Sequence, residues 1–212
     1  AENKLGQLRV AKEAGLLIPR TLVTNDQQQA RAFFSELGGQ MVAKLLRPLS
    51  VSMGQAPLFV YTSDVKEEDL LEADLLRHCP MVFQERLTKA IELRIAYVDG
   101  NCFVGAIDAS RSLKGQTDWR LASPDDCSWS AAEIPEELTA GLKALMRALG
   151  LVYGAIDIIK TLDGNYVFLE VNPGGEWGML ERDLNYPISE ALADALLTPV
   201  GDTDAGFNNY QE

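Results

Sequence analysis

Two carboxylates, Asp157 and Glu170, are predicted to face each other across a β-hairpin, where they could hold a divalent cation. Apolar, β-rich runs flank Asp163-Gly164, a dipeptide typical of two-residue hairpin loops. With that loop, Asp157 pairs with Glu170, and Asn172 lies two residues further along the same face. Like charges directly opposite in a sheet are destabilising, and a cation would remove that penalty. Three oxygen-bearing side chains on one face suit Mg²⁺ shared with phosphate groups.

Isolated cations elsewhere in the chain suit the same chemistry. Lys44 lies in an otherwise apolar strand, so it either contacts a phosphate or reaches solvent at a strand edge. Arg94 and Arg120 stand among apolar or aromatic residues, and an arginine fork suits phosphate or carboxylate. These arginines could instead pair with structural acids, Asp118 being nearest to Arg120, and each hairpin acid could pair with an arginine. A longer hairpin loop would also change the register.

A short connection after a buried strand could bind a flat base. The segment Gln84, Glu85, Arg86 and Leu87 follows the apolar run at 81–83 and could offer backbone N–H and C=O groups. The alternative is a plain exposed connection. Glu92 follows a few residues later and could bind ribose hydroxyls, or it could be an ordinary surface charge.

Local patterns predict an α+β fold with two antiparallel units and a break near residues 85–90, where a ligand between the units would be natural. Hydrophobic spacing and capping signals indicate helices over 3–14, 26–37, 64–77, 132–149 and 187–197. Strands are expected over 21–24, 40–46, 57–62 and 81–84. Two hairpins, over 91–109 and 154–173, complete the pattern, and the first places Arg94 opposite Gly105.

Composition indicates which partners the protein could bind and in which cellular compartment it is expected. The chain has 212 residues and a formal net charge of −12, which disfavours nucleic acid as a partner. We expect no membrane-spanning segment and no export signal. The cysteines, Cys79, Cys102 and Cys127, are too scattered for a zinc site, and reduced thiols favour the cytoplasm. No Ser/His/Asp or Cys/His triad, P-loop or dinucleotide-binding fingerprint is present.

The ordered set of a strand lysine, a hinge, an aspartate and a Glu-x-Asn hairpin resembles the ATP-grasp ligases over about residues 3–198. The supporting residues are Asn3-Lys4, Val42-Ala-Lys44, Phe83-Gln-Glu-Arg-Leu87, Asp157 and Leu169-Glu-Val-Asn-Pro173. Finer features look like the ribosomal-peptide maturases of the microviridin type, with the glutamate-adding RimK-like ligases next. These features are Lys89-Ala-Ile-Glu-Leu-Arg94, Asp118-Trp-Arg120, Leu151-Val-Tyr-Gly-Ala-Ile-Asp157, Glu170-Val-Asn-Pro-Gly-Gly-Glu-Trp177 and Leu180-Glu-Arg-Asp183.

The resemblance implies an ATP-grasp fold and a ligase that activates a carboxylate as an acyl phosphate and joins it to an amine or hydroxyl of a peptide. Its alternatives are a RimK-like amino-acid or glutamate ligase and a nucleotide-binding fragment without ligase activity. It implies ATP and Mg²⁺ as cofactors, a peptide or amino-acid substrate, and allows a homodimer. The implied roles are phosphate contacts by Lys4 and Lys44, adenine binding by Gln84, Glu85, Arg86 and Leu87, ribose binding by Glu92, Mg²⁺ binding by Asp157, Glu170 and Asn172, and stabilisation of the γ-phosphate and acyl phosphate by Arg94 and Arg120.

The resemblance also implies a domain plan. Residues 1–16 would be a helix that follows a missing N-terminal domain, 17–86 a lid subdomain, 87–198 a larger subdomain with the metal site, and 199–212 a polar tail. The sequence departs from many ATP-grasp enzymes, which have a glycine-rich loop after the strand lysine, because Gly54 is the single glycine in the loop after Lys44. By the resemblance, peptide maturases are similarly poor in glycine in this loop.

Overall fold

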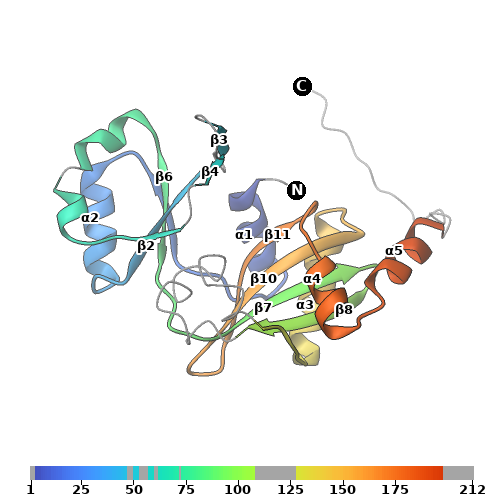
Figure 1. Ribbon diagram of the computed structural model, residues 1–212. Helices are drawn as coiled ribbons and strands as arrows, with labels where there is room; N and C mark the ends of the chain where they lie inside the picture. The colour runs from blue at the N-terminus through green and yellow to red at the C-terminus, as the bar shows by residue number, and fades with distance from the viewer. Residues whose placement is uncertain are drawn as a thin grey trace.

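Two antiparallel sheets, each with its own helices, form the two units of an α+β fold (Figure 1). The computed structural model describes residues 3–46, 50–52, 57–59, 62–71, 73–107 and 128–197. The smaller sheet has, in order, β1 (Thr21–Thr24), β6 (Met81–Glu85), β2 (Met41–Leu45) and β5 (Ser63–Asp64). The larger sheet has β11 (Tyr166–Asn172), β10 (Tyr153–Thr161), β7 (Lys89–Val98), β8 (Asn101–Ile107) and β9 (Ser130–Ala131). A separate hairpin joins β3 (Ser50–Ser52) and β4 (Pro57–Phe59).

The smaller unit packs its sheet against α2 (Gln27–Glu36) through a small apolar cluster that includes Met41 and Phe83. The Asp26 side chain caps this helix by accepting from the backbone N–H groups of Gln28 and Gln29 in its first turn. The helix predicted over 64–77 is wrong. Two 3₁₀ helices, η1 (Glu68–Leu70) and η2 (Ala73–His78), occupy most of it instead.

Strand pairing and a local side-chain bond explain this difference. Asp64 does not cap a helix, because it lies in β5 and pairs with Val42. The Asp69 carboxylate accepts a hydrogen bond from the backbone N–H of Lys66 at 2.8 Å. A carboxylate that accepts from the backbone N–H three residues earlier is typical of the start of a helix, so the helical turns begin after Lys66 and not at Asp64.

Helices pack against both faces of the larger sheet. On one face, alternate residues such as Ile95 and Ile156 pack against α1 (Lys4–Glu13) and α3 (Glu136–Ala148), whose Leu142 is fully buried. On the other face, Ala96 and Val98 pack against α4 (Gly178–Leu184) and α5 (Ile188–Leu197). The sequence did not predict α4, which is short. No helix within the described ranges is long and apolar enough to cross a membrane.

The Asp157–Glu170 pairing is confirmed, but it arises differently from the prediction. The loop has three residues, because Thr161 N–H bonds to Asn165 O (2.9 Å) and the loop closes on Gly164, which has φ +87°. This loop alone would shift Asp157 by one partner. A β-bulge then leaves Leu169 unpaired, since Ile158 pairs with Phe168 and Asp157 with Glu170. The bulge therefore restores the register that places the two carboxylates opposite each other.

The first hairpin follows its predicted register without a shift, and Arg94 pairs with Gly105. The space beside Gly105 is filled by other side chains. A Cβ at this position would lie 2.3 Å from Leu180 Cδ2 and 3.0 Å from Trp129 Cε3. Leu180 is fully buried, so it has little room to move aside.

Replacing Gly105 by alanine is therefore expected to destabilise the protein by about 1–3 kcal/mol through overpacking. Urea unfolding followed by circular dichroism would measure the loss. Gly178→Ala is the matched control, because its Cβ would meet nothing within 4 Å at the start of α4. Equal unfolding midpoints for the two variants would contradict the expected clash.

Candidate functional site

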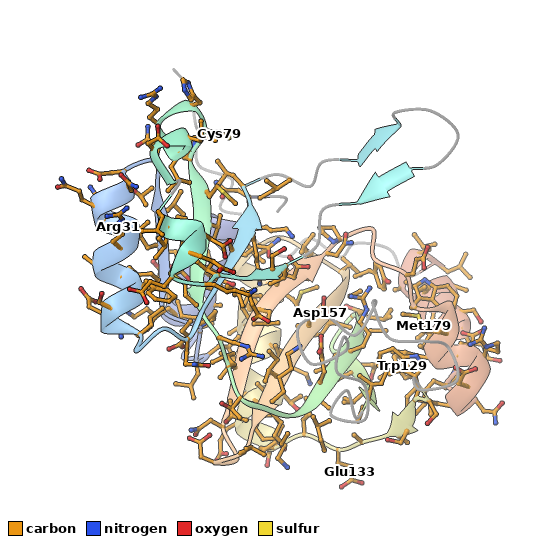
Figure 2. All side chains as sticks on the ribbon, turned by 60° about the vertical axis from the view of Figure 1, so that its left-hand side comes forward. Arg31, Cys79, Trp129, Glu133, Asp157 and Met179 are labelled. Carbon is orange, nitrogen blue, oxygen red and sulfur yellow. The ribbon has the colours of Figure 1, made fainter. Side chains whose placement is uncertain are left out.

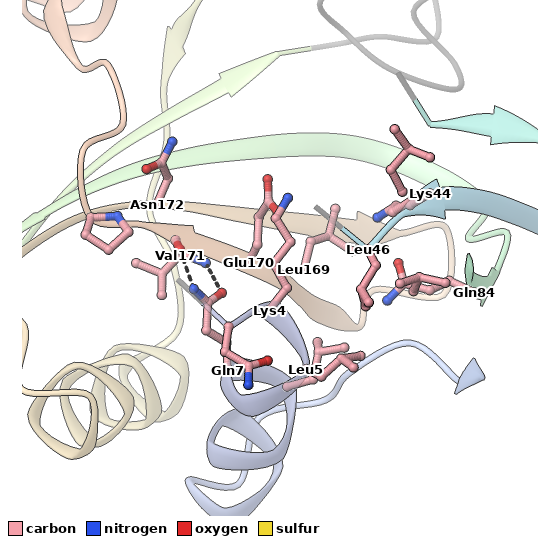
Figure 3. A pocket seen from close by; sticks show the side chains of 15 residues that line it. Lys4, Leu5, Gln7, Lys44, Leu46, Gln84, Leu169, Glu170, Val171 and Asn172 are labelled. Carbon is pink, nitrogen blue, oxygen red and sulfur yellow. Dashed lines mark hydrogen bonds and ion pairs between the residues drawn. The ribbon is translucent and has the colours of Figure 1, made fainter. Parts of the chain in front are cut away.

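A cleft of about 780 Å³ lies between the two units, where α1 and β11 face β2 and β6 (Figure 3). It brings together five of the predicted site residues, with two lysines from different units among them. These residues are Lys4, Lys44, Gln84, Glu170 and Asn172. The other lining residues are Asn3, Leu5, Gln7, Leu8, Leu45, Leu46, Val82, Leu169, Val171 and Pro173.

A row of charged residues crosses the larger sheet beside this cleft. Asp157 is paired with Arg94 on one side and with Glu170 on the other, so the three side chains share one face. Asn172 lies two residues beyond Glu170 on that face. Figure 2 shows Asp157 on the larger sheet, away from Arg31 and Cys79 of the smaller unit. The structure thus places the three predicted metal ligands on one surface.

Each acid of this row has a cationic partner. Arg94 Nη1 donates to Asp157 Oδ1 at 2.8 Å, and Lys4 Nζ forms an ion pair with Glu170. The alternative that each acid pairs with an arginine is therefore correct for Asp157, whereas Glu170 pairs with a lysine of α1 instead. These two cations offset the repulsion between the carboxylates in this structure.

Arg94 is held on more than one side. Its side chain is 11% exposed and that of Asp157 is 17% exposed. Its Nη2 donates to Glu176 O at 3.1 Å, while its Nε is buried without a hydrogen-bond partner among the described residues. An arginine bonded in this way has a fixed orientation, which suits it to positioning Asp157 and the loop that contains Glu176.

The loop after β11 lies tightly against the sheet. Tyr153 donates its hydroxyl hydrogen to Gly175 O at 2.5 Å, and burial raises the pKa of Tyr153, so the group remains a donor at neutral pH. A Cβ at Gly175 would lie 2.5 Å from Ala155 Cβ and 2.9 Å from Arg94 Nη2. The Pro173-Gly174-Gly175 turn therefore lies close against the sheet and Arg94. The contacts of Tyr153 with Gly175 and of Arg94 with Glu176 join segments distant in the sequence and were not predicted.

In the predicted hinge, residues 84–87, some residues face the cleft and others do not. The buried Gln84 side chain lines the cleft and donates to Thr21 Oγ1 at 3.0 Å. The backbone N–H of Glu85 donates to Arg20 O (3.0 Å), and that of Arg86 donates to Gln40 O (2.9 Å). Because both donors are engaged within the protein, a bound base would have to use other groups of this segment, such as those of Leu87, which is half-buried.

Of the remaining predicted site residues, Glu92 lies in the described part of the chain and Arg120 does not. Glu92 is not an ordinary surface charge, because it is buried and pairs with Lys89 Nζ at 2.9 Å. It lies on the same face of β7 as Arg94. Arg120 and Asp118 lie outside the described residues, as does most of the segment after Lys44 that contains Gly54.

The residues present fit a magnesium ion that is shared with a phosphate ligand. Asp157, Glu170 and Asn172 supply carboxylate and amide oxygens, the hard ligands that Mg²⁺ prefers. Asn172 Oδ1 accepts from Gly174 N–H at 3.1 Å, which orients the amide oxygen while leaving it a second lone pair. In the described ranges, no group of three or more His, Cys, Asp or Glu residues is arranged so that it could hold a metal ion, so an ion held here would need ligand oxygens to complete its shell.

Comparison with known proteins defines the class. No protein-family model matches the chain. The ATP-grasp ligase PsnB, solved with a phosphomimetic variant of a minimal precursor, Mg and ADP, is 28% identical with a TM-score of 0.72. The match covers 92% of this chain and 58% of PsnB. The chain has the ATP-grasp fold and resembles the ATP-grasp ligases.

Two other relatives specify the resemblance further. The macrocyclase MdnB from Microcystis aeruginosa MRC is 50% identical with a TM-score of 0.73, over 93% of this chain and 59% of MdnB. A glutathione synthetase from Thermosynechococcus vestitus is 30% identical over 177 residues, which are 79% of this chain and 50% of that enzyme. The chain therefore spans about half the length of the curated relatives that it matches. The resemblance to ATP-grasp ligases predicted from the sequence is confirmed.

Proposed function

We propose that this chain is the nucleotide-binding part of an ATP-dependent ligase that joins a carboxylate to a hydroxyl or amine of a ribosomally made peptide. The main support is the cleft, which brings Lys4 and Lys44 from two units together beside the row of Asp157, Glu170 and Asn172. In this proposal residues 17–86 form the lid subdomain and residues 87–198 form the larger subdomain with the metal site. The reaction takes place in the cytoplasm, and we propose a homodimer on the basis of the resemblance.

The proposed chemistry follows from the charges around the cleft. Lys44 and Lys4 bind the phosphates of ATP, so Lys4 exchanges its Glu170 partner for phosphate oxygens. Asp157, Glu170 and Asn172 would hold Mg²⁺, which supplies neutralisation of the phosphate charge when bound. Arg94 keeps Asp157 in place, and Arg120 contacts the acyl phosphate. Such positioning and charge neutralisation are most of what phosphoryl transfer needs.

The reaction has two balanced steps. A carboxylate oxygen of the substrate attacks the γ-phosphorus of ATP, the bond to the β,γ-bridging oxygen breaks, and ADP leaves. A hydroxyl or amine then attacks the acyl carbon, loses its proton, and displaces inorganic phosphate. The products are ADP, phosphate and an ester or amide.

A second candidate is a ligase that adds a free amino acid, as RimK-like enzymes do. The similarity to a glutathione synthetase favours it, because that name denotes joining a peptide to an amino acid. Mass spectrometry of the product separates the two functions. An internal bond lowers the mass of the peptide by one water, whereas an added amino acid raises it.

Titration calorimetry tests the nucleotide site. The full chain is expected to bind Mg-ATP, and Lys44→Met is expected to weaken binding by about tenfold or more through loss of a charge-assisted phosphate contact. The matched control is Lys12→Met, which removes an exposed lysine of α1 that is not in the cleft lining. Absence of binding would exclude both ligase functions for this chain. Binding without turnover, even with the segment present in longer relatives restored, would favour a nucleotide-binding module.

A further inference from the structure

Gln7 is a buried polar residue of α1 that contacts the backbone between two predicted metal ligands. It is 2% exposed. Its Nε2 donates to Val171 O at 2.8 Å, and its Oε1 accepts from Val171 N–H at 3.0 Å, as the dashed lines in Figure 3 show. One amide thus satisfies both backbone groups of a single residue of β11.

The position of β11 explains why such an amide is needed. The strand lies at the edge of the larger sheet, where, within the described part of the chain, no strand pairs with one side of its backbone. Leu17 O accepts from Phe168 N–H at 2.8 Å and covers one part of this edge. Gln7 covers the part at Val171, because a carboxamide carries one donor and one acceptor face, as a backbone neighbour would.

The contact of Gln7 with Val171 affects the two neighbouring residues that face the cleft. Val171 lies between Glu170 and Asn172, whose side chains point to the face opposite its own. Fixing the Val171 backbone fixes the origin of both side chains. Lys4 lies one turn before Gln7 on the same side of α1 and pairs with Glu170, so the helix and the strand are joined at two successive points.

We infer that Gln7 is a positioning residue of the nucleotide–metal site, which holds Glu170 and Asn172 in the geometry that Mg²⁺ requires. This inference rests on the proposed function. Buried partners that orient metal ligands commonly change metal affinity by about 10–100-fold when they are replaced. The same magnitude is expected here.

Gln7→Leu tests the inference, with Leu142→Val as the control. Leu142 is buried in the same core but is not in the cleft lining, so its variant reports loss of packing alone. Dissociation constants for ADP are measured with and without Mg²⁺. In Gln7→Leu the Mg²⁺-dependent gain in ADP affinity is expected to fall by about tenfold, while Mg²⁺-free binding stays close to that of the control. Hydrogen exchange at the Val171 amide is expected to accelerate in Gln7→Leu and not in Leu142→Val.

Gln7→Glu is a conservative variant whose stability is expected to depend on pH. A protonated glutamic acid has the same donor and acceptor as glutamine, whereas its carboxylate has no donor for Val171 O. Burial beside a carbonyl oxygen raises the pKa of such a carboxyl above its unfolded value. The stabilising bonds are therefore present at pH below the unfolded pKa and are lost as pH rises through the folded pKa. The Tm deficit of Gln7→Glu relative to wild type should grow between acidic and neutral pH.

The possible results separate this inference from the proposed function. ADP binding by the wild-type chain without any Mg²⁺ dependence would overturn both the metal assignment and the role of Gln7. Strong Mg²⁺ dependence that is equal in wild type, Gln7→Leu and Leu142→Val would overturn the role of Gln7 alone. Loss of Mg²⁺ dependence in Gln7→Leu, with the control unchanged, supports it.

Discussion

Replacing Asp157 by alanine is expected to lower ATP turnover by about 100-fold or more and to reduce stability by about 3 kcal/mol. The loss of turnover has its origin in the loss of a carboxylate that would hold Mg²⁺. The loss of stability has a separate origin in Arg94, whose guanidinium bonds to Asp157 at 2.8 Å and is largely shielded from water. Removal of one partner from a buried pair leaves the other charge uncompensated. Turnover would be measured by ADP release with a substrate peptide, and stability by urea unfolding.

A double variant separates the two losses. Arg94→Met combined with Asp157→Leu replaces the pair with apolar side chains, a change that is often neutral for stability. We expect the double variant to recover most of the stability lost in Asp157→Ala while turnover and Mg²⁺-dependent ADP binding stay low. If Asp157→Ala unfolds more easily but keeps its Mg²⁺ dependence, Asp157 is a structural partner of Arg94 and not a metal ligand.

Gly175→Ala is expected to weaken Mg-ADP binding by about tenfold and to destabilise the chain by about 1–3 kcal/mol. The added Cβ would lie 2.5 Å from Ala155 Cβ and 2.9 Å from Arg94 Nη2, so either the loop or the arginine must move. Movement of the loop would also lengthen the bond from Tyr153 to Gly175 O. Movement of Arg94 would change the position of Asp157 through their ion pair.

The adjacent glycine provides a matched control for this variant. A Cβ at Gly174 would meet nothing within 4 Å, so Gly174→Ala makes the same chemical change without the clash. Titration calorimetry with ADP and Mg²⁺, together with urea unfolding, would measure both variants. Equal affinities for Gly174→Ala and Gly175→Ala would show that the contact of the loop with Arg94 does not influence the site.

Features that depend on local pattern were predictable from the sequence. Among the helices of the larger unit, α1, α3 and α5 follow from hydrophobic spacing and capping signals, whereas the short α4 does not. The register of the first hairpin follows from Asp99-Gly100, both of which have positive φ. The Asp157–Glu170 pairing was predicted with the wrong loop. It is correct because a three-residue loop and a bulge at Leu169 have opposite effects on the register. Neither feature has a distinct signal in a single sequence.

Features that depend on contacts between distant segments were not predictable. The pairing of Arg94 with Asp157 requires β7 and β10 to be neighbours, although they are not joined by a hairpin. A glutamine in an amphipathic helix is usually exposed to solvent. Gln7 is instead buried, because α1 packs against the edge of β11. The helix expected over 64–77 depended on helix propensity, which the strand pairing of Asp64 overrides.

The bulge at Leu169 divides the second hairpin into two parts, whose strand pairing is set by different contacts. Between the bulge and the turn, the pairing is set by the length of the loop, whereas beyond the bulge it is set by the contacts of Val171 with Gln7 and of Asp157 with Arg94. A gain or loss of one residue near Gly164 can thus be accommodated by a change in the bulge. The end of this hairpin can therefore change in length while Asp157 stays paired with Glu170.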